Sequence, residues 1–120
     1  MLLEALIGLL IFSIGVLALI AMQSVAVSQV RDAQFRTDAS ILSERLMGEL
    51  LVARSLSAAS TAVTAWQTDV TTTLPSAAAT VTEATSSFGA AIKEIRITIT
   101  WRAPGASTDS NHTTVGLLSY

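Results

Sequence analysis

Few side chains in this sequence could carry out chemistry. The chain of 120 residues has no cysteine and a single histidine, His112. Thiolate chemistry is therefore excluded, and one imidazole without cysteine cannot complete an ordinary transition-metal site. Asp109, His112 and one of many serines could form a triad on paper, but there is no nucleophile elbow and no glycine-rich phosphate loop. These residues argue against an enzyme, a cofactor, a metal site or a small-molecule substrate.

The carboxylate of Glu4 is the most informative polar group. Between Ala5 and Met22, Ser13 is the only side chain that is not apolar. A carboxylate near the centre of a bilayer costs about 2.5 to 3.5 kcal/mol, and less near an interface. Glu4 could be hydrated at the headgroup level and stabilise the helix N-terminus. Alternatively, it could pair with a cation of another chain, and the residues alone leave both interpretations open.

The element that carries Glu4 is an apolar run, MLLEALIGLLIFSIGVLALIAMQ. About 18 consecutive residues compatible with hydrocarbon make a helix of about 27 Å, which is long enough to cross a bilayer. The apolar side chains lie on every face, so the helix must be surrounded by lipid or protein. A secretory signal peptide is disfavoured, because no basic residue precedes Arg31, the apolar run is longer than a usual signal core, and it continues into a second helical stretch without turn residues.

The next stretch, from Ser24 to about Leu56, has an apolar face at three- and four-residue spacing. Joined to the first run, it predicts one helix of about 55 residues and about 80 Å. A dimeric coiled coil would explain such a length, but no heptad persists over three or four repeats. A second, short helix is predicted from a cap at Ser60 or Thr61 to Pro75, with Trp66 as its packing anchor.

The last third of the chain has the two-residue period of strands. Isoleucines and Trp101 alternate with polar residues in KEIRITITWR, and HTTVGLLSY follows a polar loop, with Val115 and Leu117 as its apolar positions. The segment 77–83 is a third, weaker strand. The sequence thus predicts an α+β fold, in which a small antiparallel sheet packs on the second half of the long helix.

Two regions follow from this pattern: a transmembrane helix over 1–28, and over 29–120 the amphipathic helix half with a small α+β head. The helix residues expected to pack against lipid or other helices are Leu6, Ile7, Leu10, Phe12, Ile14 and Leu17. The residues expected in the core of the head are Leu42, Leu46, Leu50, Trp66, Ile97, Ile99 and Trp101. The net charge of −2 comes with no cluster of Lys or Arg, so direct nucleic-acid binding is not expected.

The run LLEALIGLLIFSIGVLALIAMQ resembles the N-terminal helix of type IV pilins and type II secretion pseudopilins. In that family a glutamate is the fifth residue after prepilin peptidase has removed a basic leader, and the new first residue is N-methylated. Here the glutamate is fourth, so Met1 would take the family's second position. The residues AWQTDV and ITITWR make the rest of the chain look most like a PilV-type minor pilin.

The resemblance implies a pilin-like fold and a structural role. Glu4 would pair with the N-terminal amine of an adjacent pilin, and the apolar helix would pack in a filament core. The partners implied are the major pilin, other minor pilins, inner-membrane lipid, prepilin peptidase and the assembly machinery. The chain would wait in a bacterial inner membrane as a single-pass protein with its head in the periplasm. It would then join an extracellular pilus, supporting adhesion, motility or DNA uptake.

Two other functions stay open from the sequence. A minor pseudopilin of a type II secretion system would share the N-terminal helix but serve protein export. A single-span periplasmic binding protein would use the helix only as an anchor, and Glu4 would then be incidental. Arg31 and Arg36 follow the helix and by themselves favour a cytoplasmic C-terminal side, so the periplasmic orientation rests on the basic leader that the resemblance implies.

Overall fold

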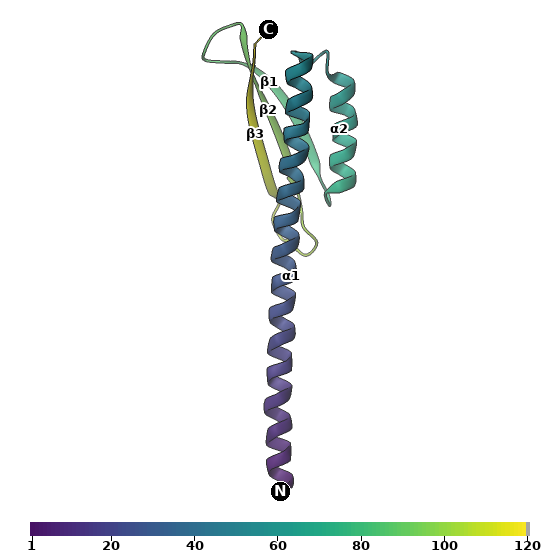
Figure 1. Ribbon diagram of the computed structural model, residues 1–120, viewed down its shortest axis with the longest axis vertical. Coiled ribbons are helices and arrows are strands. Elements are labelled where there is room, and N and C mark those ends of the chain that lie inside the picture. The colour runs from purple at the N-terminus through teal and green to yellow at the C-terminus, as the bar shows by residue number, and fades with distance from the viewer. Residues whose placement is uncertain (120) are drawn as a thin grey trace. The chain divides into compact units, whose positions relative to one another are not determined.

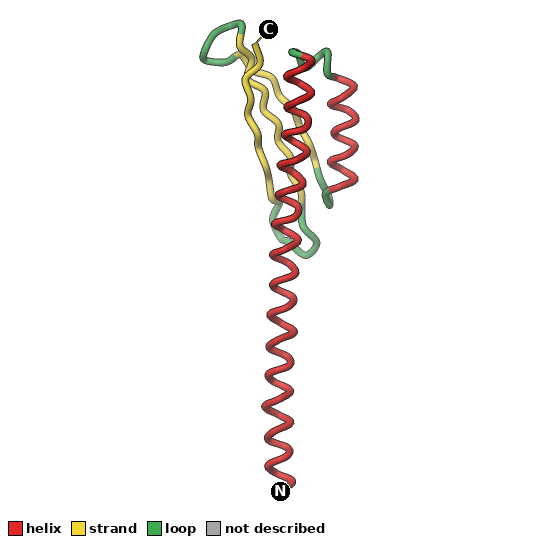
Figure 2. Tube along the Cα trace, in the orientation of Figure 1, coloured by secondary structure: helices red, strands yellow, loops and turns green. Residues whose placement is uncertain are grey.

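The computed structural model describes residues 1–119 and has the predicted α+β fold (Figure 1). A long helix is followed by a short helix and three antiparallel strands (Figure 2). The element bounds are α1 Leu2–Ala53, α2 Ser60–Thr73, β1 Ala78–Thr85, β2 Ile92–Trp101 and β3 Ser110–Ser119.

The chain forms two compact units, the N-terminal unit Met1–Ala33 and the head unit that begins at Gln34. Helix α1 runs through both, because 52 residues pass without proline or any other interruption. It ends at Ala53, three residues earlier than predicted, where Arg54 adopts a left-handed backbone with φ 57°. The functional boundary between residues 28 and 29 stays a prediction.

Helix α2 begins where the sequence indicated, but its predicted cap is wrong. Ala59 is the N-cap residue, and no side chain caps the helix. The hydroxyl that acts in this turn belongs to Ser55, whose Oγ accepts a hydrogen bond from the Ala58 N–H at 3.1 Å. At the other end, Leu74 is extended ahead of Pro75, as expected for a residue before proline.

The sheet has the order β1-β2-β3, and β2 pairs along its whole length with β3. On β2, Ile95, Ile97, Ile99 and Trp101 are buried, whereas Arg96 is exposed. On β3, the apolar residues named from the sequence pattern, Val115 and Leu117, do not face the core. They are about half exposed on the outer face, and Leu118 is the buried residue.

The inner face of β3 fits the helix through small and polar groups instead of a row of apolar ones. A Cβ added to Gly116 would lie 2.5 Å from Sδ of Met47, so the absence of a side chain leaves room for the end of the Met47 side chain against the strand. Two residues earlier on β3, on the same face, the Thr114 hydroxyl donates a hydrogen bond to Oγ of buried Ser43 at 3.1 Å. An alternation rule that looks for apolar residues misses this face, because it carries a glycine and a threonine.

Candidate functional site

Glu4 lies in the first turn of α1, where the helix dipole favours an acidic side chain. It is exposed, and its carboxylate has no ion pair or hydrogen bond with any of residues 1–119. Leu2, Leu3, Leu6 and Ile7 surround it and are all more than half exposed. Glu4 is therefore an isolated acid on an apolar surface, and the described part of the chain provides no cation for it.

The six helix residues expected to pack against lipid or other helices are exposed in the isolated chain. Their exposed fractions lie between 51% for Ile7 and 69% for Phe12. The other four are Leu6, Leu10, Ile14 and Leu17. Helix α1 is long and apolar enough to cross a membrane, and nothing in its most apolar window is buried in the chain. This surface needs lipid or other protein to cover it.

Gly8 and Gly15 lie on nearly the same side of α1 as Glu4. At about 100° per residue, Gly8 lies about 40° from Glu4 around the helix axis. Gly15 lies between the two, about 20° from Gly8. A Cβ added to either glycine would meet nothing within 4 Å, so the chain's own packing requires neither. Glycine inside a helix costs about 0.5 to 1 kcal/mol relative to alanine. In apolar helices such small residues allow close approach of a second helix.

The head unit has the seven sequence-predicted core residues in one cluster. Leu42, with 9% of its surface exposed, is the least covered of them. The other six are 3% exposed or less: Leu46, Leu50, Trp66, Ile97, Ile99 and Trp101. They come from α1, α2 and β2, so the second half of α1 forms one wall of the core.

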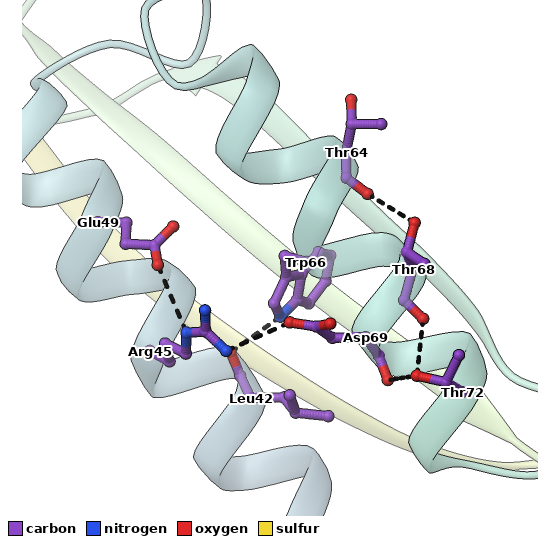
Figure 3. A network of polar contacts seen from close by, with 8 residues as sticks. All are labelled: Leu42, Arg45, Glu49, Thr64, Trp66, Thr68, Asp69 and Thr72. Atoms are coloured by element: carbon purple, nitrogen blue, oxygen red, sulfur yellow. Dashed lines mark hydrogen bonds and ion pairs between the residues drawn. The ribbon is translucent and has the colours of Figure 1, made fainter.

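Polar contacts join α1 to α2 (Figure 3). Nε1 of Trp66 donates a hydrogen bond to the Leu42 carbonyl oxygen at 2.9 Å, and both residues are buried. Nη1 of Arg45 donates to Oδ2 of Asp69 at 3.2 Å, and its Nε lies 3.4 Å from Oε1 of Glu49. These ion pairs are exposed and contribute little stability, about 0 to 1 kcal/mol each. The network holds two helices together and contains no nucleophile poised beside a base.

The groups that could have formed a triad are engaged elsewhere. Asp109 accepts a hydrogen bond from Nε of Arg102 at 2.7 Å. His112 lies 3.1 Å from the Thr114 hydroxyl, which itself donates to Ser43. Ser43 donates its only proton to the Ser40 carbonyl, and Thr114 donates its only proton to Ser43. In the hydrogen bond between His112 and Thr114, Nε2 of His112 is therefore the donor and the Thr114 hydroxyl oxygen accepts. This relay fastens β3 to α1.

Two further contacts of the head were not visible in the sequence. Ser43 and Thr114 are 71 residues apart, and no local pattern joins them. The amide of Gln67 donates a hydrogen bond to the Ala79 carbonyl at 3.1 Å and so ties α2 to β1. In the segment AWQTDV the tryptophan is a recognisable packing residue, whereas no local pattern marks the glutamine beside it as a contact to a strand.

No family model, curated protein or solved structure matches the chain. The apolar run of α1 with its single acid, and the head, are the features that bear on function.

Proposed function

We propose that this protein is a membrane-anchored structural subunit, a minor pilin of a type IV pilus that helps to begin or cap the filament. The observation that carries the proposal is that one uninterrupted helix has an exposed apolar first half with a lone carboxylate and a second half that belongs to the head core. An anchor needs only the apolar length. An assembly subunit also needs a group that sets the register between helices.

Glu4 supplies that group in the proposal. When the subunit leaves lipid for a bundle of apolar helices, burial of hydrocarbon changes little, because lipid tails and leucine side chains are similarly apolar. A polar pair is then the strongest source of specificity available along this surface. The N-terminal amine of a neighbouring subunit is a cation at the matching depth, and each charge compensates the other where neither could be buried alone.

The glycines on the Glu4 side of α1 support the same mechanism. Gly8 and Gly15 weaken the isolated helix and serve no contact within the described chain. A neighbouring helix that packs against this side would gain close backbone contact over two turns, next to the carboxylate. The partners in this proposal are the major pilin and other minor pilins, with inner-membrane lipid covering the helix before assembly.

Substitution of Glu4 tests the proposal. Glu4→Ala should leave membrane insertion and the unfolding of the head unchanged, and should reduce incorporation into surface filaments at least tenfold. Glu4→Gln keeps the shape without the charge and should behave like Glu4→Ala. Ser13→Ala, a change about 180° from Glu4 around the same helix and without any effect on charge, is the matched control and should assemble within about twofold of the unchanged protein. Normal incorporation of Glu4→Gln would contradict the role of the charge.

Deletion of the gene separates the pilus from a type II secretion system. Loss of surface fibres with normal release of secreted hydrolases supports a minor pilin. Loss of secretion with normal fibres supports a minor pseudopilin. If both remain normal, the chain is neither, and a single-span periplasmic binding protein becomes the better hypothesis.

A further inference from the structure

The two edges of the head sheet differ in their protection. At the β1 edge, α2 packs along the strand and Gln67 occupies the Ala79 carbonyl at 3.1 Å. At the other edge, β3 is the last strand of the described sheet and runs for ten residues in unbroken register with β2. Natural edge strands are usually guarded by charges, proline, a bulge or a covering element. From 110 to 119, β3 has no proline, Asp, Glu, Lys or Arg.

The ladder fixes which backbone groups of β3 face outward. The Ser86 N–H donates to the Ile92 carbonyl in register with the β1–β2 pairs, so even-numbered residues bond across these two strands. The bond from Gln67 to Ala79 agrees, because Ala79 is odd-numbered and faces away from β2. Odd-numbered residues of β2 therefore bond to even-numbered residues of β3. The N–H and C=O groups of Asn111, Thr113, Val115 and Leu117 point away from the sheet.

The edge is also held rigid from behind. Thr114 is hydrogen-bonded to Ser43, Gly116 lies against Met47, and Leu118 is buried in the core. On the outer face, Val115 and Leu117 are 50% and 48% exposed. A strand laid beside β3 would cover these two side chains and take up the outward backbone groups. Both features are those of strand addition, in which the backbone gives affinity and alternate side chains give selectivity.

We propose that the β3 edge accepts an extended segment of a different subunit, which adds a fourth strand to the head sheet. The segment would be at least about five residues long, uncharged, with aliphatic or β-branched side chains at alternate positions beside Val115 and Leu117. The choice of a different subunit rests on the proposed function as an assembly protein.

Copies of this chain fit the edge less well. The β1 edge of a second copy is less open, because Gln67 occupies the Ala79 carbonyl and α2 packs beside the strand. Two β3 strands could pair antiparallel, but β3 runs parallel to the second half of α1, as the successive contacts of Ser43 with Thr114 and Met47 with Gly116 demonstrate. Antiparallel pairing would make the second halves of the two α1 helices antiparallel, whereas the subunits of the proposed filament all run in the same direction.

Hydrogen exchange at single-residue resolution tests the proposal. The full chain would be measured alone in a nonionic detergent and in the assembly purified from its own host. The amides of Thr113, Val115 and Leu117 should exchange at least tenfold more slowly in the assembly. Those of Thr114 and Gly116 should be slow in both samples. Equal slowing of all five amides would overturn strand addition in favour of general burial.

A pair of substitutions at one position gives a second readout. Val115→Pro removes an outward N–H that the chain's own ladder does not use, and edge strands tolerate proline at such positions. It should fold and insert normally but lose at least tenfold in recovery with the assembly. Val115→Ala keeps the N–H and should stay within about twofold of the unchanged chain. Equal losses for both variants would overturn a backbone contact.

The outcomes distinguish this inference from the proposed function. If Glu4 is required for assembly but the odd-numbered amides exchange equally fast in both samples, the edge proposal fails and the proposed function stands. If no Glu4-dependent assembly is recovered, both fail. If the chain alone in detergent is a dimer with protected odd-numbered amides, the occupant is a second copy, and the proposal of a different subunit is wrong.

Discussion

The two tryptophans of the head provide a sharp test of its packing. Both are buried, with 3% of Trp66 and 1% of Trp101 exposed. Nε1 of Trp66 donates a hydrogen bond to the Leu42 carbonyl, whereas Nε1 of Trp101 is buried without a hydrogen-bond partner in the described chain. Trp→Phe removes the same ring atoms at each site, so the apolar losses largely cancel in a comparison. What remains is the difference between the two indole N–H groups.

The magnitude follows from hydrogen-bond energetics. Trp66→Phe loses a net contribution of about 0.5 to 1.5 kcal/mol, whereas Trp101→Phe removes an unpaired donor whose burial costs about 1 to 3 kcal/mol. Trp66→Phe should therefore lower the free energy of unfolding by roughly 1.5 to 4.5 kcal/mol more than Trp101→Phe does. At about 4 to 8 °C per kcal/mol for a domain of this size, the Tm values should differ by at least about 6 °C.

The assay is unfolding of the full chain in a nonionic detergent, by urea and by heat. The chain has two tryptophans, so each variant keeps one as its fluorescent probe. Far-ultraviolet circular dichroism provides a signal common to all three proteins. A larger loss of stability in Trp101→Phe than in Trp66→Phe would refute the assignment of the paired and unpaired indoles.

Three other changes test the head and its separation from the N-terminal unit. Leu46→Ala should lower the free energy of unfolding by about 2 to 5 kcal/mol in urea titrations, whereas Leu10→Ala should leave the unfolding of the head unchanged, because Leu46 is fully buried and Leu10 is 61% exposed. Gly116→Val should cost about 1 to 3 kcal/mol by overpacking against Met47, and Met47→Ala in the same chain should recover part of the Tm loss. Arg45→Ala should lower the free energy of unfolding by less than about 1 kcal/mol, because both of its ion pairs are exposed. A loss above about 1 kcal/mol that persists in 0.5 M salt would contradict this.

The elements could be predicted because their signals are local. The long helix has no proline and keeps helical spacing, and the alternation from Ile95 to Trp101 has no helical alternative. The inner face of β3 could not be predicted in this way. Which face of β3 is the inner one depends on the α1 residues that lie against it: Met47 lies against Gly116, and Ser43 is hydrogen-bonded to Thr114. Such a face is decided by tertiary contact rather than by the hydrophobicity of the strand.

The interfaces were only partly accessible from sequence. Glu4 stood out because an acid in an apolar run is rare and costly. The free edge of β3 carries no comparable signal, since the absence of charge or proline becomes informative only when the strand is known to be last in the sheet. Likewise, the protection of the β1 edge depends on a hydrogen bond between Gln67 and the Ala79 carbonyl, twelve residues later, which no local pattern indicates.

The surroundings of Glu4 in the assembled state are the most direct test of the central claim. The measurement is photo-crosslinking in living bacteria from a probe introduced at Leu3 or Ala5, on either side of the carboxylate, with the crosslinked peptides mapped by mass spectrometry. The account predicts crosslinks to the first residues of another subunit, and their loss in the Glu4→Gln background. Crosslinks to lipid alone, unchanged by Glu4→Gln, would contradict it.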